Sequence, residues 1–167
     1  MTVMVHNYLK AVSSLRYDND SGRLVRLGTG KEVSTRASGR HYIKIWVDGV
    51  CLQYHNVVWV CCGNSIPEGY SVDHIDGDKL NNRIENLRLA SSREQTYNTR
   101  SYGKTSKYKG VDYNKASGKW FSRIMVSGKS LWLGAYPSEK AAADAYDLAA
   151  TKYHKEFKRS NNSGYEV

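Results

Sequence analysis

The distribution of apolar and polar residues predicts a hairpin and a short helix in the first third of the chain. β-forming residues stand on both sides of Asp48-Gly49 over residues 41–54, and Asp-Gly supplies the positive φ angles of a tight two-residue turn. The apolar run at residues 57–62 ends at Gly63-Asn64, which favours a short buried helix over an exposed strand. We therefore expect a hairpin followed directly by a helix.

Two short extended segments come next, at residues 70–75 and 84–89, with a polar turn at residues 76–82 between them. Ser91 and Glu94 then have the spacing of a capping box, which predicts the start of a helix. The order strand, loop, strand, helix brings side chains from a loop and from one helix face to a single small site.

The second half of the chain has a different pattern. Residues 99–106 are polar and lack apolar periodicity, and we interpret them as a linker. Three β-prone stretches follow, and Ser138 is placed to cap a helix rich in alanine. The chain is thus predicted to be α+β, with a first domain at residues 1–98 (core motif 54–98) and a second at 107–162, in which a three-stranded antiparallel sheet packs on one helix.

Composition points to a globular protein with a polyanionic partner. Hydrophobic residues make up 40% of the chain, enough to form a core, and the formal net charge is +9. Residues 101–167 are the more basic part, with 12 Lys and Arg against 6 Asp and Glu. Each basic side chain placed on a phosphate releases a condensed counterion, so nucleic acid is the first candidate partner. A basic but merely solvated surface is the alternative.

The cysteines and the hydropathy pattern bear on where the protein works. Cys51, Cys61 and Cys62 form no Cys-x-x-Cys pair, so neither a zinc ribbon nor a disulfide framework fits, and we expect buried thiols in a reducing compartment. No run of about 18 apolar residues and no signal-peptide pattern is present. We expect a soluble, intracellular, cytoplasmic protein without a membrane partner.

One segment resembles a nuclease family closely. The HNH endonuclease signature is matched by Val72-Asp73-His74-Ile75-Asp76-Gly77-Asp78 and then Asn81-Asn82-Arg83-Ile84-Glu85-Asn86-Leu87-Arg88-Leu89. The resemblance covers roughly residues 15–98 and is greatest to the phage and intron-encoded HNH homing endonucleases, whose fold is the ββα-metal motif. It implies that Asp73 binds a divalent cation, that His74 is the general base, and that Asn86 holds the loop and orients His74.

The chemistry agrees with these residue types. Hydrolysis of a phosphodiester needs an activated water, charge neutralisation at the phosphate and stabilisation of the departing oxygen. A hard-oxygen site with open positions suits Mg²⁺ or Mn²⁺. Because Asp73 and His74 are neighbours, a fully extended strand would point them to opposite sides. We therefore expect the loop to turn so that both can serve one phosphate.

One position departs from the family pattern. The resemblance implies a second metal ligand, His or Asn, where this chain has Gln95. A carboxamide oxygen can bind a hard cation, but the longer side chain has an extra rotamer to freeze. Either Gln95 ligates the metal with weakened activity, or Asn98 takes its place.

Two other interpretations of the same segment were considered. An Asx-rich turn without function is possible, whereas a calcium loop of the EF-hand type fails because its twelfth position, counted from Asp73, is Ile84. For His55 a structural hydrogen bond is favoured over a catalytic role.

The C-terminal segment resembles the DNA-binding domain of plant ethylene-response factors. The match spans about residues 106–162 and rests on Ser106-Lys107-Tyr108-Lys109-Gly110-Val111, Gly118-Lys119-Trp120, Leu131-Trp132-Leu133-Gly134 and Ala141-Ala142-Ala143-Asp144-Ala145-Tyr146-Asp147-Leu148. It implies a sheet that lies in the major groove. The implied DNA-contacting residues are Lys109, Asn114, Lys119, Arg123 and Trp132, with Lys115 and Lys129 nearby. Asp112, Met125 and Ser130 replace base-reading residues of the family, and Trp120 could face either the core or the DNA.

The combined expectation is a metal-dependent DNA endonuclease of the homing type, acting on double-stranded DNA in a phage-infected bacterial host. The second domain would supply affinity and sequence preference, and no obligate protein partner is expected. Two alternatives stay open: a DNA-binding regulator with an inactive HNH site, and a ribonuclease. The narrow major groove of A-form RNA disfavours the last.

Overall fold

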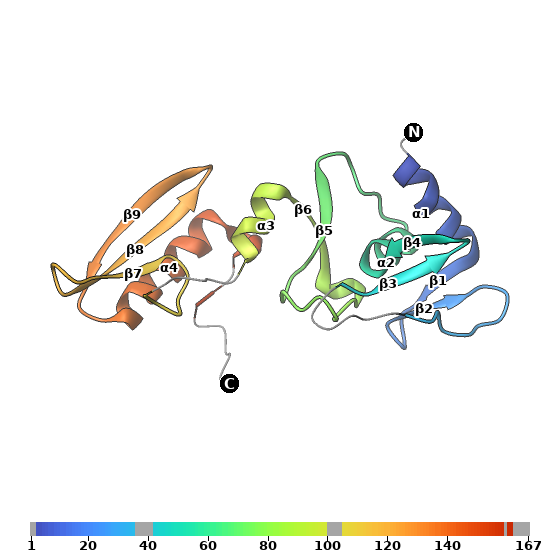
Figure 1. Ribbon diagram of the computed structural model, residues 1–167, viewed down its shortest axis with the longest axis horizontal. Helices are drawn as coiled ribbons and strands as arrows, with labels where there is room; N and C mark the ends of the chain where they lie inside the picture. The colour runs from blue at the N-terminus through green and yellow to red at the C-terminus, as the bar shows by residue number, and fades with distance from the viewer. Residues whose placement is uncertain (1–2, 36–41, 100–104, 159, 162–167) are drawn as a thin grey trace. The chain divides into compact units, whose positions relative to one another are not determined.

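The computed structural model describes residues 3–35, 42–99, 105–158 and 160–161, with only the backbone at residues 3–7 and 9. The chain divides into two compact units, Met1–Ser92 and Arg93–Val167 (Figure 1). The division comes earlier than the linker predicted at residues 99–106, of which residues 100–104 lie outside the described residues.

The first unit is built from short ribbons and two helices. In chain order its elements are α1 (Val3–Ser14), β1 (Leu15–Asp18), β2 (Arg23–Arg26), β3 (Lys44–Val47), β4 (Val50–Gln53), α2 (Tyr54–Cys61), β5 (Tyr70–His74), the 3₁₀ helix η1 (Ile84–Asn86) and β6 (Leu87–Ser91). The strands pair as three separate two-stranded antiparallel ribbons, β1–β2, β3–β4 and β5–β6.

The hairpin and helix predicted near Asp48 are confirmed. β3 and β4 pair in antiparallel register, and the turn residues Asp48 and Gly49 have φ angles of 47° and 80°. The predicted helix is α2, which begins three residues before the apolar run. Its Val57 and Val58 are fully buried, so α2 forms the centre of this unit's core.

Three elements were not predicted. Helix α1 and the ribbon β1–β2 precede the hairpin, and their residues Ala11, Leu15 and Leu24 join the core with Ile45. β1 and β2 have only four residues each, and the chain between them lacks the Asp-Gly or Asn-Gly dipeptide that marks the β3–β4 hairpin. The extended segment predicted at residues 84–89 is also partly wrong: residues 84–86 form η1, and the strand begins at Leu87.

The second unit contains α3 (Ser92–Asn98), β7 (Val111–Asn114), β8 (Lys119–Val126), β9 (Lys129–Tyr136), α4 (Glu139–Tyr153) and the short η2 (Lys155–Phe157). The three strands form one antiparallel sheet in the order β7-β8-β9, as predicted. Ser138 Oγ accepts a hydrogen bond from the Ala141 amide at 3.2 Å, which confirms it as the N-cap of α4.

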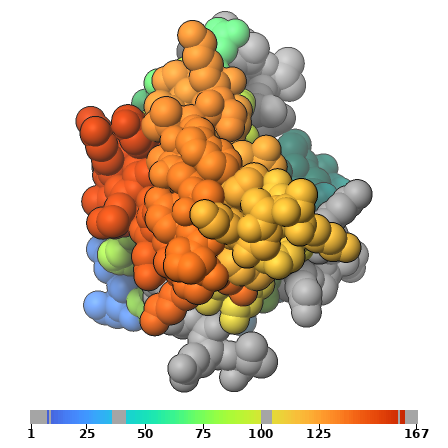
Figure 2. All heavy atoms as spheres, turned by 90° about the vertical axis from the view of Figure 1, so that its left-hand side faces the viewer, coloured from blue at the N-terminus to red at the C-terminus, as the bar shows by residue number. Residues whose placement is uncertain are grey.

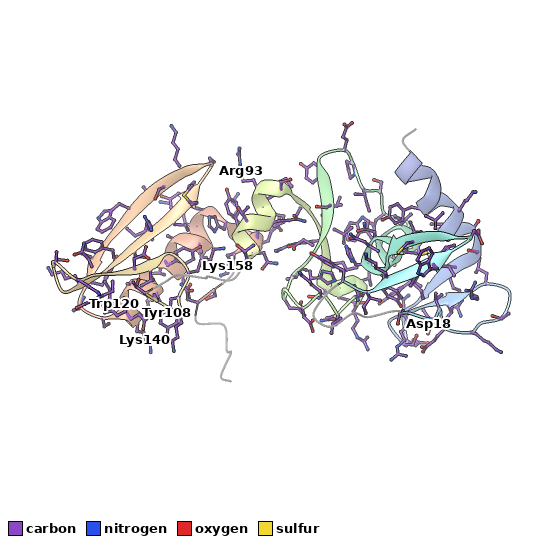
Figure 3. All side chains as sticks on the ribbon, viewed as in Figure 1. Asp18, Arg93, Tyr108, Trp120, Lys140 and Lys158 are labelled. Carbon is purple, nitrogen blue, oxygen red and sulfur yellow. The ribbon has the colours of Figure 1, made fainter. Side chains whose placement is uncertain are left out.

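Helix α4 covers one face of this sheet. Tyr146 and Ala150 pack on Ile124 of β8, and Ala142 and Ala143 pack on Val111 of β7. Small alanines allow the helix to approach the sheet closely. Trp120 and Tyr108, both labelled in Figure 3, pack against the second of these clusters, so Trp120 belongs to the core side of the sheet.

Two further expectations can be compared with the structure. Cys51 and Cys62 are exposed and Cys61 is partly buried, so the expectation of three buried thiols is wrong. In the part of the chain that is described, no helix is both long and apolar enough to cross a membrane.

Candidate active site and nucleic-acid interface

Asp73 and His74 lie together at the end of β5, in the ribbon with β6. Asp73 is opposite Arg88 and His74 is opposite Leu87. Because successive strand residues alternate between faces, His74 shares the buried face with Val72, and Asp73 is on the other face. The expected turn comes later, at residues 75–76, where the amide of Gly77 donates to the carbonyl oxygen of His74 at 3.0 Å. The structure therefore keeps the two side chains on opposite faces.

The imidazole of His74 is buried and bonded to Asn82. Nε2 of His74 lies 3.0 Å from Oδ1 of Asn82, and the amide nitrogen of Asn82 donates to the carbonyl oxygen of Leu80 at 3.0 Å. That second bond fixes which way the amide faces, so Oδ1 is the acceptor and Nε2 carries the hydrogen. In that tautomer of the neutral ring, Nδ1 is the nitrogen without a hydrogen.

A second histidine lies beside the first. The rings of His55 and His74 meet edge to face with centroids 5.0 Å apart, and Tyr42 lies 5.0 Å from His55. Burial, together with the neighbouring His74, lowers the pKa of His55 to about 3, so His55 is neutral. The expected structural hydrogen bond is not seen at its buried Nδ1, which has no partner among the described residues.

Asn86 organises the loop between the two strands. Its Nδ2 donates to Oδ1 of Asp76 at 2.9 Å and to the carbonyl oxygen of Asn81 at 2.8 Å, and its Oδ1 accepts from the Asp76 amide at 3.1 Å. Burial alone would raise the pKa of Asp76, but hydrogen bonds from Asn86, Asp78 and Asn81 hold it below its usual value. Asn86 thus has the loop-holding position implied by the resemblance.

Asn82 is the site residue that sequence reasoning missed. The resemblance assigns the orientation of His74 to Asn86, whereas the structure brings Asn82 to the imidazole. Its only sequence signal is its place in the polar turn, a feature that it shares with several neighbours.

Asp73 is paired with an arginine across the ribbon. Nη2 of Arg88 lies 3.0 Å from Oδ2 of Asp73, and Nε of Arg88 donates to the same oxygen at 3.2 Å. The two side chains are 13% and 16% exposed. Any cation on Asp73 must therefore share this carboxylate with a guanidinium or displace it.

The donor chemistry at Asp73 fits a hard divalent cation. Mg²⁺ is commonly held by one or two carboxylates, with waters and substrate phosphates completing its sphere. Within the described residues, no group of three or more His, Cys, Asp or Glu side chains gathers as a ligand set. Gln95, the second implied ligand, lies on α3 in the second unit and is partly buried.

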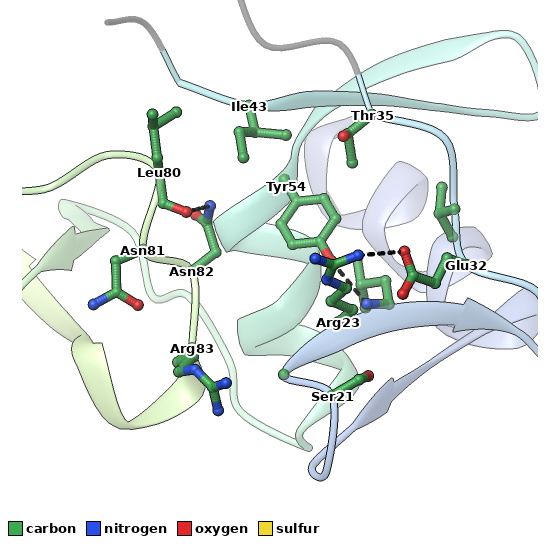
Figure 4. Close-up of a pocket in the computed structure, with 13 residues that line it drawn as sticks. Ser21, Arg23, Glu32, Thr35, Ile43, Tyr54, Leu80, Asn81, Asn82 and Arg83 are labelled. Carbon is green, nitrogen blue, oxygen red and sulfur yellow. Dashed lines mark hydrogen bonds and ion pairs between the residues drawn. The ribbon is translucent and has the colours of Figure 1, made fainter.

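A cavity of about 400 Å³ lies in the first unit beside Asn82. Its lining includes Arg83 and the ion pair of Arg23 with Glu32, whose Nη1 and Oε2 lie 2.7 Å apart (Figure 4). Tyr54 and Leu24 also line the cavity, and the Tyr54 hydroxyl accepts a hydrogen bond from the Leu24 amide. Asn82, which contacts His74, is thus part of a concave surface with polar lining residues.

The outer face of the second unit's sheet carries most of the predicted DNA contacts. Register and alternation place Asn114, Lys119, Arg123 and Trp132 on the face opposite α4. Lys115 lies in the β7–β8 turn, and Lys129 begins β9. Figure 2 shows these strands in yellow and orange. Five basic or aromatic side chains of the predicted set are exposed there: Lys115, Lys119, Arg123, Lys129 and Trp132.

Phe121 also belongs to this face. Its ring meets that of Trp132 edge to face, with centroids 4.8 Å apart, and it lies opposite Asp112 in the strand register. Sequence reasoning did not single it out, because the alternation of β8 shows its outward direction only once the register is known.

Lys109 lies elsewhere. Its ammonium group donates to the carbonyl oxygens of Thr96, Tyr97 and Thr99 at 2.8–2.9 Å, at the C-terminal end of α3. A cation at that end of a helix satisfies carbonyl groups that have no partner within the helix. Lys109 therefore has a structural role at the end of α3. Its predicted contact with DNA stays a prediction.

A stacked pair of rings also packs helix α3 against the rest of the second unit. The rings of Tyr97 and His154 are 3.8 Å apart and nearly parallel, at 6°. Nε2 of His154 donates to the carbonyl oxygen of Met125 in β8 at 2.7 Å. The helix that ends the strand, loop, strand, helix order is thus packed on the sheet unit.

These features define two kinds of module: a small strand-loop-strand site with a buried histidine beside a carboxylate, and a sheet with one basic, aromatic face. Residues 53–97 match the family model described as HNH endonuclease, and residues 106–156 match the model described as AP2 domain. The chain thus carries an HNH endonuclease segment followed by an AP2 domain, and both resemblances are confirmed.

Several known proteins are similar to parts of the chain. Protein 3.8 of Escherichia phage T7 is 38% identical over 76 residues, which cover 45% of this chain and 63% of that protein. An uncharacterized HNH endonuclease of Acanthamoeba polyphaga mimivirus is 31% identical over 111 residues, which cover 66% of this chain and 57% of that protein. An AP2-like ethylene-responsive transcription factor of Arabidopsis thaliana is 44% identical over 50 residues, which cover 30% of this chain and 10% of that protein.

The chain spans less than two thirds of the length of each of these relatives. A solved structure titled "DNA binding and cleavage by the HNH homing endonuclease I-HmuI" is similar at 25% identity with a TM-score of 0.44, covering 78% of this chain and 75% of that one.

Proposed function

We propose that the chain is a divalent-metal-dependent endonuclease that hydrolyses phosphodiester bonds in double-stranded DNA. The observation that carries the proposal is His74, a buried imidazole whose Nε2 is tied to Asn82 and whose chain neighbour is a carboxylate. The match of this segment to the HNH endonuclease model supports it. The homing type and the phage-infected host remain expectations from the resemblance.

In the proposed reaction, His74 takes a proton from the attacking water at Nδ1. The bond from Nε2 to Asn82 selects the tautomer in which Nδ1 is basic. His74 is 3% exposed, so the side chain or the loop at residues 75–82 has to open for DNA and water to reach it. Arg88, which holds Asp73, would also present positive charge to a bound phosphate.

Asp73 would hold Mg²⁺ or Mn²⁺, and Gln95 is the second candidate ligand. When bound, such a cation neutralises phosphate charge and stabilises the departing oxygen. Asn86 supports this site through the loop, because its three hydrogen bonds fix Asp76 and Asn81.

The AP2 domain would supply most of the affinity for DNA. The outer face of β7-β8-β9 is free of α4 and presents Lys119, Arg123 and Trp132. Basic groups bind phosphates, and aromatic or arginine side chains contact base edges in the major groove. The small HNH site would then cut where this domain binds.

A DNA-binding regulator with an inactive HNH site is the second candidate. It is favoured by the Arg88–Asp73 ion pair, which occupies the proposed metal carboxylate, and by a glutamine where the family has His or Asn. In that case the outer face of the sheet would keep its function and the chain would not cut.

Cleavage of supercoiled plasmid, of random duplex DNA and of RNA separates the candidates. Wild type, His74→Ala and Asp73→Asn should be compared with Mg²⁺, with Mn²⁺ and with EDTA, with Asp20→Asn as the matched control because Asp20 is an exposed carboxylate in the β1–β2 turn. Metal-dependent cleavage lost in the first two variants and kept in the third supports the endonuclease. Tight binding without cleavage under either metal supports the regulator, and cleavage of RNA alone contradicts both.

A further inference from the structure

An acidic side chain lies on the basic face of the AP2 domain, in the edge strand β7. Asp112 of β7 is on the outer side of the sheet, opposite Phe121, and its Oδ2 accepts from Nη2 of Arg123 at 2.7 Å. The side chain of Asp112 is 41% exposed and that of Arg123 is 61% exposed. The pair is thus fully on the surface that we propose to meet DNA.

Stability does not account for this pair. An exposed ion pair of this kind contributes little to folding, because both partners are well solvated and long side chains lose rotamer freedom. On a DNA-facing surface a carboxylate also repels phosphates, so it reduces affinity. The contact does place Nη2 of Arg123 beside Oδ2 of Asp112.

The neighbours of Arg123 on the outer face are aromatic. Trp132 lies opposite Arg123 in the β8–β9 register, next to an irregularity between Ser122 and Arg123, and Phe121 lies two positions before Arg123 in β8. The Phe121 and Trp132 rings pack edge to face. Arg123 thus contacts the Asp112 carboxylate from a position in the strand between two aromatic residues.

We propose that Asp112 is a specificity-determining residue, which orients Arg123 to read a single guanine in the major groove. Arginine forms two parallel hydrogen bonds to O6 and N7 of guanine, a pairing that depends on the plane of the guanidinium. Without Asp112, Arg123 can swing to a phosphate, where its charge gives affinity without sequence information. This inference rests on the proposed binding of DNA by the outer face of the sheet.

The test is a binding selection from a randomised duplex by the full chain in EDTA, so that no DNA is cut. Wild type should prefer guanine at one position by roughly 5- to 100-fold, the range of a bidentate base contact. Arg123→Ala should lose that preference, and Asp112→Ala should lose most of it while binding random DNA more tightly. Asp112→Asn, whose amide oxygen still accepts from Arg123, should keep part of it.

A matched control and a double variant complete the design. Asp144→Ala removes the same charge from the exposed side of α4 and should leave the base preference unchanged. The Asp112→Ala/Arg123→Ala double variant should show no loss beyond Arg123→Ala alone, because the two residues act as one unit.

Three outcomes would overturn the inference. If Asp112→Ala keeps the wild-type preference, the carboxylate does not orient Arg123. If Asp112→Ala changes the preference equally in the Arg123→Ala background, Asp112 contacts a base by itself. If the wild-type chain binds no duplex DNA, the proposed role of the sheet fails as well, an outcome distinct from the other two.

Discussion

Nε2 of His74 and Oδ1 of Asn82 lie 3.0 Å apart, and both side chains are buried, at 3% and 6% exposure. Asn82 is held in turn by the carbonyl oxygen of Leu80. The tautomer of the proposed general base is therefore set by a loop residue eight positions later in the chain.

Asn82→Ala should lower the turnover number of DNA cleavage by roughly 10- to 100-fold, the range seen when an orienting partner is lost. The physical reason is that Nε2 loses its acceptor, and the imidazole can take the tautomer in which Nδ1 carries the hydrogen. Single-turnover cleavage and gel-shift binding should be measured together. The neighbouring Asn81→Ala, which removes a different loop bond, serves as control. Equal losses in both variants would assign Asn82 to general loop stability.

Arg88→Ala should change the metal dependence of the first unit. Removing the guanidinium leaves Asp73 without this partner, so divalent cations should bind more tightly and less Mn²⁺ should be needed for half-maximal binding. The loss of both hydrogen bonds from Arg88 to the Asp73 carboxylate should also lower the free energy of unfolding by about 1–3 kcal/mol. Calorimetric titration with Mn²⁺ and thermal unfolding in EDTA measure the two effects. Unchanged or weaker Mn²⁺ binding would contradict competition at Asp73.

The stability of the first unit should fall as the pH is lowered. The folded-state pKa of His55 is about 3, below its ordinary value of 6.5, so the unfolded chain binds more protons between these values. The contribution of neutral His55 to the free energy of unfolding is then fully present above about pH 6.5. This contribution is lost as the pH falls toward 3, with a slope of at most about 1.4 kcal/mol per pH unit for one proton. The lowered pKa of Asp76 acts in the same direction at acidic pH.

Urea unfolding at several pH values measures this slope. His55→Phe keeps a ring next to His74 and removes the titrating group, so it should flatten the dependence between about pH 4 and 6. An unchanged slope in His55→Phe would mean that other groups dominate.

Gly110→Ala should destabilise the second unit strongly. Gly110 has φ of 72°, and a Cβ there would clash with both the carbonyl oxygen of Arg123 and the Tyr146 ring. Gly118→Ala is the control, since Gly118 has a similar φ of 64° and nothing within 4 Å of a Cβ. We expect a loss of about 1 kcal/mol in the control, from backbone strain alone, and a clearly larger loss in Gly110→Ala, both measured by thermal unfolding.

Lys109→Met should loosen α3. Its ammonium group donates to three carbonyl oxygens at the end of that helix, so amide hydrogen exchange in residues 92–98 should become faster. The exposed Lys107→Met is the control. If Lys109 acts instead as a DNA contact, the variant will reduce the salt dependence of DNA binding by about one counterion and leave α3 unchanged.

Local signals in the sequence predicted the elements whose structure is decided locally. The Asp48-Gly49 turn, the Ser138 cap and the strand spacing of the AP2 domain all depend on residues a few positions apart. The position of Asp73 next to His74 at the end of a strand was predicted for the same reason.

What could not be predicted depends on residues distant in sequence. Lys109 reaches α3 from more than ten positions away, and Asp112 meets Arg123 only because β7 and β8 pair in one register. Asn82 reaches His74 because the loop closes through its own hydrogen bonds, and the orienting role of Asn86 stays a prediction. Helix α1 joins the core through residues such as Ala11, and no local sequence pattern predicts that contact.

The position of α3 has a consequence for how such proteins can be recombined. The HNH match ends at residue 97, yet packing assigns the chain from Arg93 onward to the other unit. A crossover in the polar stretch at residues 99–106 would separate Tyr97 from His154 and the α3 carbonyls from Lys109. Functional exchange of DNA-binding modules therefore requires a junction upstream of α3, and a module exchanged in that way brings the residue at position 95 with it.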